Sequence, residues 1–277
     1  MNFFNRLHYG LQAIRKSRFM TINPLASTLF FLIPERLSRL MRLVCHFRWQ
    51  RFEFLARRLD WGPVDTVLLG GEYDFVERLL EDYDQPTIID LGANIGTFSL
   101  FVFSCSPSAI VHSVEASASV YTMLEQNCRK NPSLDSRTYQ AAVWSSSGQL
   151  QFQTNTQAST QGKVSQNGNE VVNAITLTQL LNNHVQGRVD LLKMDIEGAE
   201  EEVLCASEPL LSQVEQIVVQ IHPNYINRDR VEQVLRRTFD FLYCVPNRLS
   251  PNPLLVAARR PQGYHLETLW ERDNKTF

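Results

Sequence analysis

Residues 87–99 decide the fold of this chain, and they read Thr-Ile-Ile-Asp-Leu-Gly-Ala-Asn-Ile-Gly-Thr-Phe-Ser. The stretch Thr87–Leu91 is β-branched or apolar except for Asp90, which is typical of a buried strand. Gly92 then permits a tight turn, and Gly96 permits the following helix to approach the strand closely. This stretch therefore predicts a strand, a turn that binds a small molecule, and a helix whose N-terminal N–H groups face the ligand.

Outward from this stretch, short β-rich runs alternate with helical ones. The predicted strands are residues 87–91, 109–114, 138–143, 189–194, 216–221, 241–245 and 254–258. The predicted helices are residues 97–105, 117–130, 199–206 and 228–238. Regular alternation of this kind predicts an α/β fold, with a doubly wound, mostly parallel sheet that has helices on both faces. Ligands of such sheets bind at the carboxyl ends of the strands, so the search for chemistry narrows to the residues that end each strand.

The first two strand ends favour one cofactor over another. Glu115 ends the second predicted strand, where a carboxylate can accept both hydroxyls of a ribose. The dinucleotide motif needs a further glycine where this chain has Asn94. A negative Asp90 at the turn would repel a pyrophosphate and attract a cationic sulfonium. We therefore expect S-adenosylmethionine rather than NAD.

The fourth and fifth strand ends carry further polar groups. Asp195 and Glu197 follow Lys193-Met194 at alternate positions, so both can line one pocket. Residues 200–202 are three glutamates, and in the first turn of a helix such residues have a structural explanation, because they meet the positive end of its dipole. His222 follows the fifth strand and is a candidate general base.

Taken together, DLGANIGTFS (residues 90–99), Glu115 and KMDIEGAE (residues 193–200) resemble the FkbM family of S-adenosylmethionine-dependent methyltransferases over roughly residues 70–260. The resemblance implies the class I methyltransferase (Rossmann-like) fold, with a seven-stranded sheet whose last strand is antiparallel. It also implies O-methylation of a hydroxyl on a sugar, glycolipid or natural product. The predicted cofactor-binding residues are Glu72, Asp90, Gly92, Ala93, Asn94, Gly96, Glu115, Ala116, Ala142 and Asp195, and the predicted catalytic residues are Lys193, Asp195, Glu197 and His222.

Several catalytic and functional alternatives stay open at this point. His222 could act as base, oriented by Asp195 or Glu197. Alternatively, the acidic cluster could hold Mg²⁺ or Ca²⁺ and polarise the hydroxyl, although we assign no metal ligand. A catalytically inactive protein of the same fold, recruited to a membrane or a partner protein, is the alternative to an enzyme. Binding of S-adenosylmethionine, of NAD or of neither separates these possibilities.

Composition narrows the class of protein. The chain has 277 residues, of which 44% are hydrophobic and 10% aromatic, so it can build a sizeable core and is not intrinsically disordered. Its formal net charge of −2 gives no overall attraction to nucleic acid, and we expect no such partner. The five cysteines include no Cys-x-x-Cys pair, which favours reduced, mostly buried thiols in the cytoplasm over disulfides or a zinc site.

The N-terminal part of the chain differs in charge, with eleven Lys or Arg against three Asp or Glu in residues 1–60. We find no signal peptide, and the apolar run of residues 24–34 is too short to cross a bilayer. Residues 35–60 predict a basic amphipathic helix that packs on the main domain or a second copy, or else attaches peripherally to anionic lipid. The predicted domains are a mainly helical extension (1–69), the methyltransferase domain (70–260) and a tail (261–277). Oligomeric state is left open.

Overall fold

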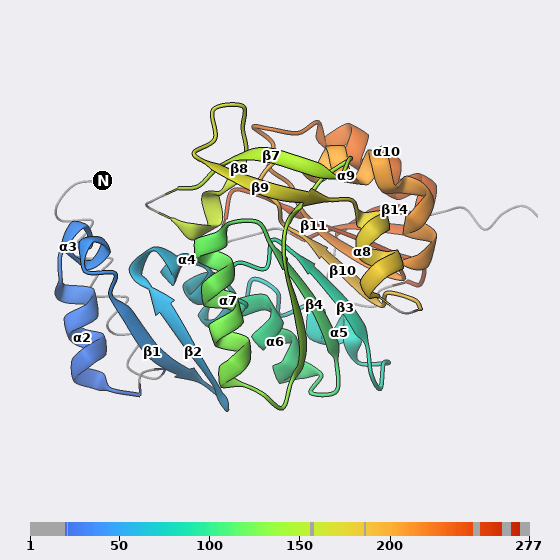
Figure 1. Cartoon of the computed structure of the whole chain (residues 1–277). Coiled ribbons are helices and arrows are strands. Elements are labelled where there is room, and N and C mark those ends of the chain that lie inside the picture. The colour runs from blue at the N-terminus through green and yellow to red at the C-terminus, as the bar shows by residue number, and fades with distance from the viewer. Residues whose placement is uncertain are drawn as a thin grey trace, which may run out of the picture.

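The computed structural model describes residues 20, 22–155, 158–185, 187–245, 250–261 and 267–271, and one eight-stranded sheet runs through its centre (Figure 1). Across the sheet the order is β14 (Glu267–Glu271), β12 (Phe241–Val245), β13 (Leu254–Ala258), β11 (Gln216–Gln220), β10 (Leu191–Met194), β3 (Thr87–Leu91), β4 (Ile110–Glu115) and β5 (Asp135–Gln140). The five strands from β11 to β5 are parallel, whereas β13 is antiparallel to both of its neighbours. This arrangement confirms the class I methyltransferase fold.

Helices cover both faces of the sheet because adjacent strand residues point to opposite sides. Ile88 belongs to one hydrophobic cluster with Phe98 of α6, while its neighbour Ile89 belongs to a second cluster with Leu204 of α9. The helices α6 (Thr97–Cys105) and α7 (Ala118–Lys130) contribute to the first cluster, and α8 (Leu177–His184), α9 (Glu200–Ser207) and α10 (Arg228–Thr238) contribute to the second. The four helices predicted between residues 97 and 238 are confirmed, and α8 is an additional α-helix in the same stretch.

Two details of the predicted sheet were wrong. The predicted strand 138–143 is divided, because β5 ends at Gln140 and Ala142–Val143 forms β6 in another sheet. The predicted tail also contains β14, which adds an eighth strand antiparallel to β12. An edge strand pairs on one side only, so β14 needs no continuous apolar run and leaves little signal in the sequence.

A second, four-stranded sheet lies over the carboxyl ends of the main strands (Figure 1). Its order is β6 (Ala142–Val143), β9 (Glu170–Ile175), β7 (Gly148–Gln153) and β8 (Lys163–Val164), with the short helix η3 (Ser159–Gln161) between β7 and β8. Its buried side chains are few, and they include Ala142, Phe152 and Val172. A sheet with so few inward apolar residues has a weak hydrophobic pattern, which is why the sequence did not predict it.

The prediction of a helix over residues 35–60 was wrong. After α2 (Pro24–Leu32) and α3 (Glu35–Leu40), the chain forms an antiparallel hairpin of β1 (Val44–Trp49) and β2 (Phe52–Arg57). In β2 the residues Phe52, Phe54 and Ala56 alternate as buried positions, and this spacing of two residues is that of a strand. Residues 1–19 and 21 of the predicted extension lie outside the described part of the chain, and Met20 between them is a turn residue.

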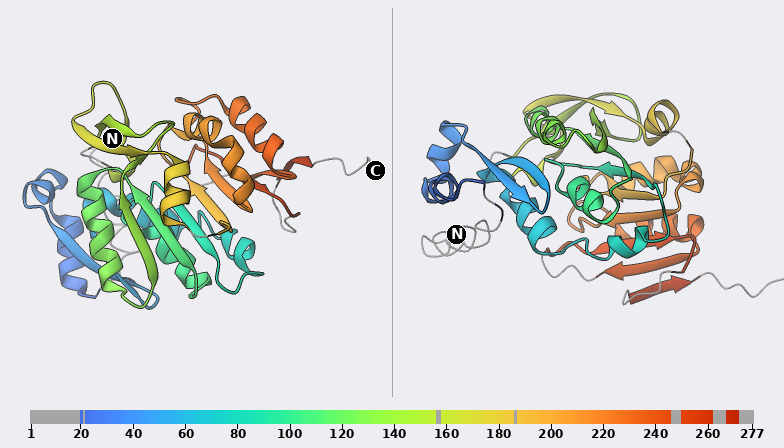
Figure 2. Two further views of the ribbon diagram at one scale, coloured as in Figure 1. Left: turned by 45° about the vertical axis from the view of Figure 1, so that its right-hand side comes forward. Right: turned by 90° about the horizontal axis from the view of Figure 1, so that it is seen from below.

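The hairpin is fastened to the main domain through α7 (Figure 2). Asn127 accepts the N–H of Leu55 at 2.7 Å and donates to its carbonyl at 3.1 Å. One turn further along α7, Asn131 makes the same two bonds with Glu53, at 3.1 and 2.8 Å. These amide pairs satisfy backbone groups of β2 that have no strand partner there. The hairpin is therefore part of the folded body of the protein.

Short helical segments connect the hairpin to the central sheet and supply residues to its carboxyl edge. They are η1 (Arg58–Asp60), α4 (Trp61–Pro63), η2 (Val64–Leu69) and α5 (Val76–Leu80). Another short helix, η4 (Glu208–Gln213), lies elsewhere in the chain, between α9 and β11. Trp61 is 2% exposed and packs edge-on against Phe31 of α2. This packing fixes the segment that carries Glu72 and Tyr73 toward the sheet.

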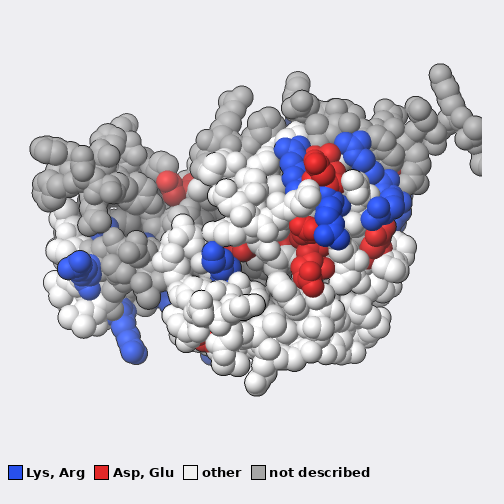
Figure 3. Space-filling view, turned by 90° about the horizontal axis from the view of Figure 1, so that it is seen from above, with Lys and Arg blue, Asp and Glu red and all other residues white. Residues whose placement is uncertain are grey.

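The surface over α9 and α10 mixes charges of both signs (Figure 3). Arg237 pairs with Glu208 at 2.6 Å, and Arg230 pairs with Glu201 at 2.9 Å. Such exposed pairs contribute little to stability and create no single-sign field. All five cysteines are free thiols, of which Cys45 is buried and the other four are half-buried, whereas mostly buried thiols were expected. Among the described helices, none has both the length and the apolar character that a bilayer crossing requires.

Candidate active site

A cavity of about 410 Å³ lies at the carboxyl ends of β3, β4, β10 and β11, within the size range of small-molecule sites. On the side of the second sheet, Phe152 and the short helix η3 line this cavity. The predicted site residues on its wall are Glu72, Gly92, Ala93, Asn94, Glu115, Ala116, Ala142, Lys193, Asp195, Glu197 and His222. Asp90 and Gly96 are not on the wall. The structure thus brings together all of the predicted catalytic residues and most of the predicted cofactor residues.

The turn after β3 is shaped by its glycines. Gly92 has a φ of 76°, and a Cβ there would overlap the backbone carbonyl oxygen of Asp195. No other residue could follow this path, because the turn runs directly against the end of β10. Gly96 has a φ of 92° and begins α6 in contact with Leu124, so its role is to place the helix rather than to touch a ligand.

Glu115 is positioned by the backbone. Its carboxylate accepts the N–H of Asn94 at 3.0 Å and that of Ser117 at 2.9 Å, and the residue is 8% exposed. Burial raises its pKa to about 7, against the opposing effect of these two hydrogen bonds. Each oxygen keeps a lone pair for a further donor. Because Glu115 also lines the cavity, it would hold the ribose hydroxyls of S-adenosylmethionine.

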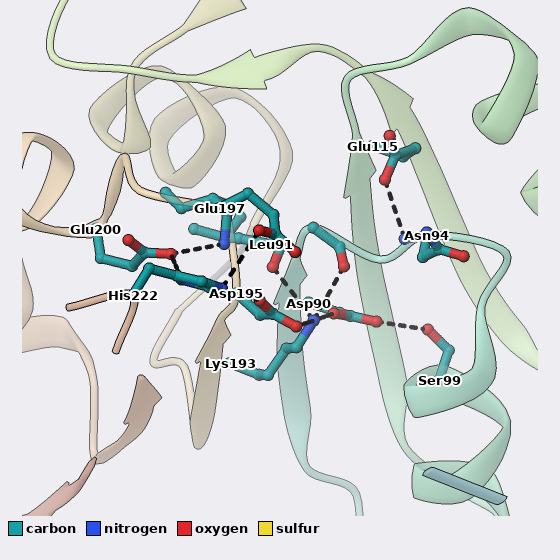
Figure 4. A network of polar contacts seen from close by, with 12 residues as sticks. Asp90, Leu91, Asn94, Ser99, Glu115, Lys193, Asp195, Glu197, Glu200 and His222 are labelled. Atoms are coloured by element: carbon teal, nitrogen blue, oxygen red, sulfur yellow. Dashed lines mark hydrogen bonds and ion pairs between the residues drawn. The ribbon is translucent and has the colours of Figure 1, made fainter. Parts of the chain in front are cut away.

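Asp90 departs from its predicted role. Its carboxylate is fully buried, 3.0 Å from the Lys193 ammonium, and it accepts the Ser99 hydroxyl at 3.1 Å (Figure 4). Lys193 also donates to the carbonyl of Gly92 at 3.0 Å. The negative charge of Asp90 is therefore balanced by Lys193, and the argument that Asp90 itself attracts a sulfonium was wrong. The acidic groups that face the cavity are Glu72, Glu115, Asp195 and Glu197.

His222 lies within a cluster of three carboxylates (Figure 4). Its Nδ1 is 2.8 Å from Glu200 Oε1, while its Nε2 is 3.7 Å from Asp195 Oδ1 and 3.5 Å from Glu197 Oε2. Burial lowers the pKa of His222, but the hydrogen bond to Glu200 and the three negative charges outweigh it and raise the pKa to about 9. At neutral pH the ring is an imidazolium, which cannot accept a proton. The prediction of His222 as general base, oriented by Asp195 or Glu197, is corrected accordingly.

Glu200 is the partner that the sequence analysis missed. It is fully buried and accepts the N–H groups of Ile196 and Gly198, each at 3.0 Å, in addition to its contact with His222. The sequence did not indicate this role, because an acidic residue in the first turn of a helix is already explained by its favourable interaction with the helix dipole. Asp195, Glu200 and His222 each offer one atom within 4.8 Å of the others, so a divalent cation would find ligands here, although Glu200 already has several donors.

Glu197 and Asp195 face the cavity from the loop after β10. Glu197 has a φ of 53°, an unusual conformation for a residue other than glycine. Burial, followed by the charge of Asp195, raises the pKa of Glu197 to about 7. Asp195 receives two hydrogen bonds from Gln220, at 2.8 and 3.0 Å, when the amide is oriented to donate. Glu197 is therefore a group in this cluster whose charge changes near neutral pH.

Tyr73 is a further site residue that sequence reasoning missed. It lines the cavity, is 2% exposed and packs edge-on against Phe98. Its buried hydroxyl has no hydrogen-bond partner within the described part of the chain. Buried polar atoms are nearly always satisfied, so an unpaired hydroxyl on a cavity wall fits a bound polar ligand. Together with the carboxylate of Glu115, this group matches the chemistry of S-adenosylmethionine.

Replacing Glu115 by glutamine is expected to weaken the binding of S-adenosylmethionine by roughly 10- to 150-fold, because a buried charge-assisted hydrogen bond contributes about 1.5–3 kcal/mol. Isothermal titration calorimetry measures this directly. Glu125→Gln on the exposed side of α7 is the matched control and should bind as the wild type does. Unchanged affinity in Glu115→Gln would place the ribose elsewhere.

Comparison with known proteins agrees with this geometry. Residues 90–243 match the family model described as the methyltransferase FkbM domain. The hexuronic acid methyltransferase AglP of Haloferax volcanii is 29% identical over 163 residues, which cover 58% of this chain and 66% of AglP, slightly less than two thirds of that relative.

Solved structures show the fold alone. The METTL16 methyltransferase domain aligns with a TM-score of 0.52 at 12% identity, covering 94% of this chain and 93% of that domain. A precorrin-6y C5,15-methyltransferase from Geobacter metallireducens aligns with a TM-score of 0.44 at 12% identity, covering 74% of this chain and 92% of that one. The match to the family model covers more than half of the chain. This protein is therefore a member of the FkbM methyltransferase family, and its cofactor is S-adenosylmethionine.

Proposed function

We propose that this methyltransferase methylates a hydroxyl group of a sugar-containing acceptor, either a free glycan, a glycolipid or a glycosylated natural product. The observation that carries the proposal is the position of Glu197, whose carboxylate lines the cavity 3.5 Å from His222 Nε2, and burial raises the pKa of this carboxyl. A group of this kind is suited to accept a proton from a weakly acidic hydroxyl. The relative named as a hexuronic acid methyltransferase supports a sugar as the acceptor.

Bound S-adenosylmethionine supplies an electrophilic methyl group on a sulfonium. The protein's main contribution to such a displacement is alignment and exclusion of water, which can supply roughly 7–11 kcal/mol of the reduction in the barrier. Glu197 accepts the proton that the hydroxyl loses as its oxygen gains the methyl group, and later releases it to solvent. His222 stays charged and holds Glu197 and Asp195 in place, while Glu200 holds His222. Lys193 keeps its proton through its contact with Asp90.

The direct test is transfer of a labelled methyl group to three classes of acceptor: nitrophenyl glycosides, a lysine-containing peptide and an RNA oligonucleotide. The proposal expects label on a sugar oxygen and none on the other two. Label on nitrogen would overturn O-methylation. Cofactor binding without transfer to any acceptor would favour a non-catalytic binding protein.

A divalent cation at Asp195, Glu200 and His222 is the second mechanism that the geometry allows. Such an ion would polarise the hydroxyl in place of a carboxylate base. Repeating the transfer assay with a chelator separates the two mechanisms, because transfer that depends on Glu197 as base survives chelation. Loss of activity with the chelator, restored by Mg²⁺ or Ca²⁺, would support the cation.

A further inference from the structure

A second cavity, of about 570 Å³, adjoins the first on the side of the second sheet. The two share Gln161, Glu197, His222 and Asn252 on their walls. They therefore meet at the cluster where the proposed function places the methyl transfer. An acceptor in the second cavity would therefore reach that cluster.

The wall of the second cavity is rich in amide side chains, among them Gln161, Asn169 and Asn224. An amide carries both donors and acceptors, so a wall of amides suits a ligand with many hydroxyls. Asn169 is already fixed, because its Oδ1 accepts the N–H and the hydroxyl of Thr154 at 2.9 and 3.0 Å. This preformed polar wall contrasts with the mixed apolar wall around Phe98 and Phe152 in the first cavity.

Among the described residues, Lys163 is the cationic side chain on the wall of this second cavity apart from the imidazolium of His222. The Lys163 ammonium lies 4.1 Å from the centre of the Tyr225 ring, at cation–π distance. Within the described part of the chain it makes no ion pair with a carboxylate. Tyr225 is in turn packed against Gly198, where any Cβ would come within 2.7 Å of the tyrosine. Tyr225 therefore positions Lys163 on the cavity wall, where the ammonium has no ion-pair partner among the described residues.

We propose that the second cavity is the acceptor site and that Lys163 selects an acceptor sugar with an anionic substituent, a carboxylate or another acidic group. This inference rests on the proposed function, which places the methyl transfer where the two cavities meet, but it concerns a different property, the charge of the acceptor. Amides such as Asn224 bind the hydroxyls, and the ammonium of Lys163 pairs with the acidic group. Charge-assisted bonds of this kind are about twice as strong as neutral ones.

The test measures binding, not turnover. Protein saturated with S-adenosylhomocysteine is titrated with nitrophenyl glucuronide and with its uncharged methyl ester, and the affinities are obtained by saturation-transfer NMR. We expect the acid to bind roughly 5- to 10-fold more tightly than the ester, and Lys163→Gln to remove the difference. Lys130→Gln at the end of α7 is the matched control and should keep it.

Equal binding of acid and ester by the wild type, or a preserved difference in Lys163→Gln, would overturn the proposal. Its failure is distinguishable from failure of the proposed function. Methyl transfer to neutral glycosides without any preference for the acid refutes only the role of Lys163. Binding that depends on Lys163, with no transfer to any glycoside, refutes only the proposed reaction.

An independent observation concerns α2 and α3, which lie at the outer side of the hairpin in Figures 1 and 2. On α2, Phe30 and Phe31 are buried against the hairpin and Trp61. The helix turns Leu25, Leu29 and Leu32 away from this contact, and their exposed fractions are 78%, 58% and 58%. Leu40 and Met41, at the end of α3, are 80% and 55% exposed. Exposed apolar side chains gathered on one part of a protein mark interaction sites, so these residues are candidates for contact with a partner.

The positive charge beside these exposed apolar residues favours an anionic partner. Arg36 and Arg42 are exposed on and beside α3, and residues 1–60 carry eleven Lys or Arg against three Asp or Glu. We infer that α2 and α3 form a docking surface for an anionic lipid bilayer. Their leucines enter the boundary of the acyl region while the arginines meet the lipid phosphates.

Co-sedimentation of the full chain with vesicles tests this surface. We expect binding to vesicles that contain phosphatidylglycerol, little binding to phosphatidylcholine alone, and a loss of binding as salt is raised. The triple variant Leu25→Ser, Leu29→Ser, Leu40→Ser changes exposed positions only and should bind at least tenfold more weakly. Val171→Ser, which is 55% exposed on β9, is the matched control.

Unchanged sedimentation of the triple variant, or no binding by the wild type, would overturn lipid docking. A wild-type dimer in light scattering that the triple variant converts to a monomer would instead assign the surface to a second copy of the chain. Deleting residues 1–60 is not a suitable test, because Phe47 and Phe54 belong to the main core cluster.

Discussion

Glu197→Gln is expected to slow methyl transfer by about 10²–10⁴-fold, the usual contribution of a positioned general base. The variant keeps the size of the side chain and removes its capacity to accept a proton. The affinity for S-adenosylmethionine should change little, because Glu115, not Glu197, is the predicted ribose ligand. Single-turnover kinetics and calorimetry on the same preparation measure the two effects separately.

The protonation of Glu197 also determines the direction in which the rate of methyl transfer should change with pH. Below about pH 7 the Glu197 carboxyl holds a proton and cannot accept another, so the wild-type rate should rise as the pH increases through about 7. The residual rate of Glu197→Gln should lack that rise. Glu125→Gln serves again as the carboxyl-to-amide control and should keep the wild-type profile. A wild-type rise with a midpoint near pH 7 that persists in Glu197→Gln would assign the base to another group.

Asp90→Asn is expected to destabilise the fold by about 3–5 kcal/mol, because it leaves the Lys193 ammonium without its nearest counter-charge. Lys193 is 4% exposed, and its other carboxylate neighbour, Asp195, is 3.9 Å away. Urea denaturation followed by circular dichroism measures the loss. The double variant Asp90→Asn, Lys193→Met removes both charges and should recover much of the stability.

The same experiment decides between two roles of Asp90. An ion-pair role predicts that stability falls and that the double variant rescues it. Normal stability in Asp90→Asn together with a large loss of cofactor affinity would contradict the structure and return Asp90 to direct contact with the cofactor. Ser99→Ala, which removes only the neutral hydrogen bond to Asp90, should have an effect of about 0.5–1.5 kcal/mol.

The parts of the fold that could be predicted from the sequence are those with strong local patterns. The buried strand Thr87–Leu91 and the helix Arg228–Thr238 were predicted at their observed limits, because continuous apolar runs and amphipathic spacing determine them locally. The hairpin of β1 and β2 was predicted as a helix, since its arginines and leucines also fit a helical period. Its strands are specified by contacts with α7 that are distant in the sequence, through Asn127 and Asn131.

The site residues could be identified from their positions at the strand ends, whereas their protonation states follow from contacts that only the structure shows. The strand ends identified Glu115, Asp195, Glu197 and His222, because parallel strands bring their carboxyl ends to one edge. The pairing of His222 with Glu200 depends on how α9 packs beside β11, and no spacing rule contains that information. The sequence therefore suggested a neutral imidazole as base, whereas the three carboxylates around it keep the ring charged.

The proposed mechanism requires His222 to be an imidazolium at neutral pH and Glu197 to be the base. An NMR titration of the His222 ring in protein saturated with S-adenosylhomocysteine tests it most directly, with assignment by comparison to His222→Gln. A pKa of about 9 is expected, so the ring nitrogens should report the charged form throughout the neutral range. A pKa near the reference value of about 6.5 would contradict it and restore His222 as the base.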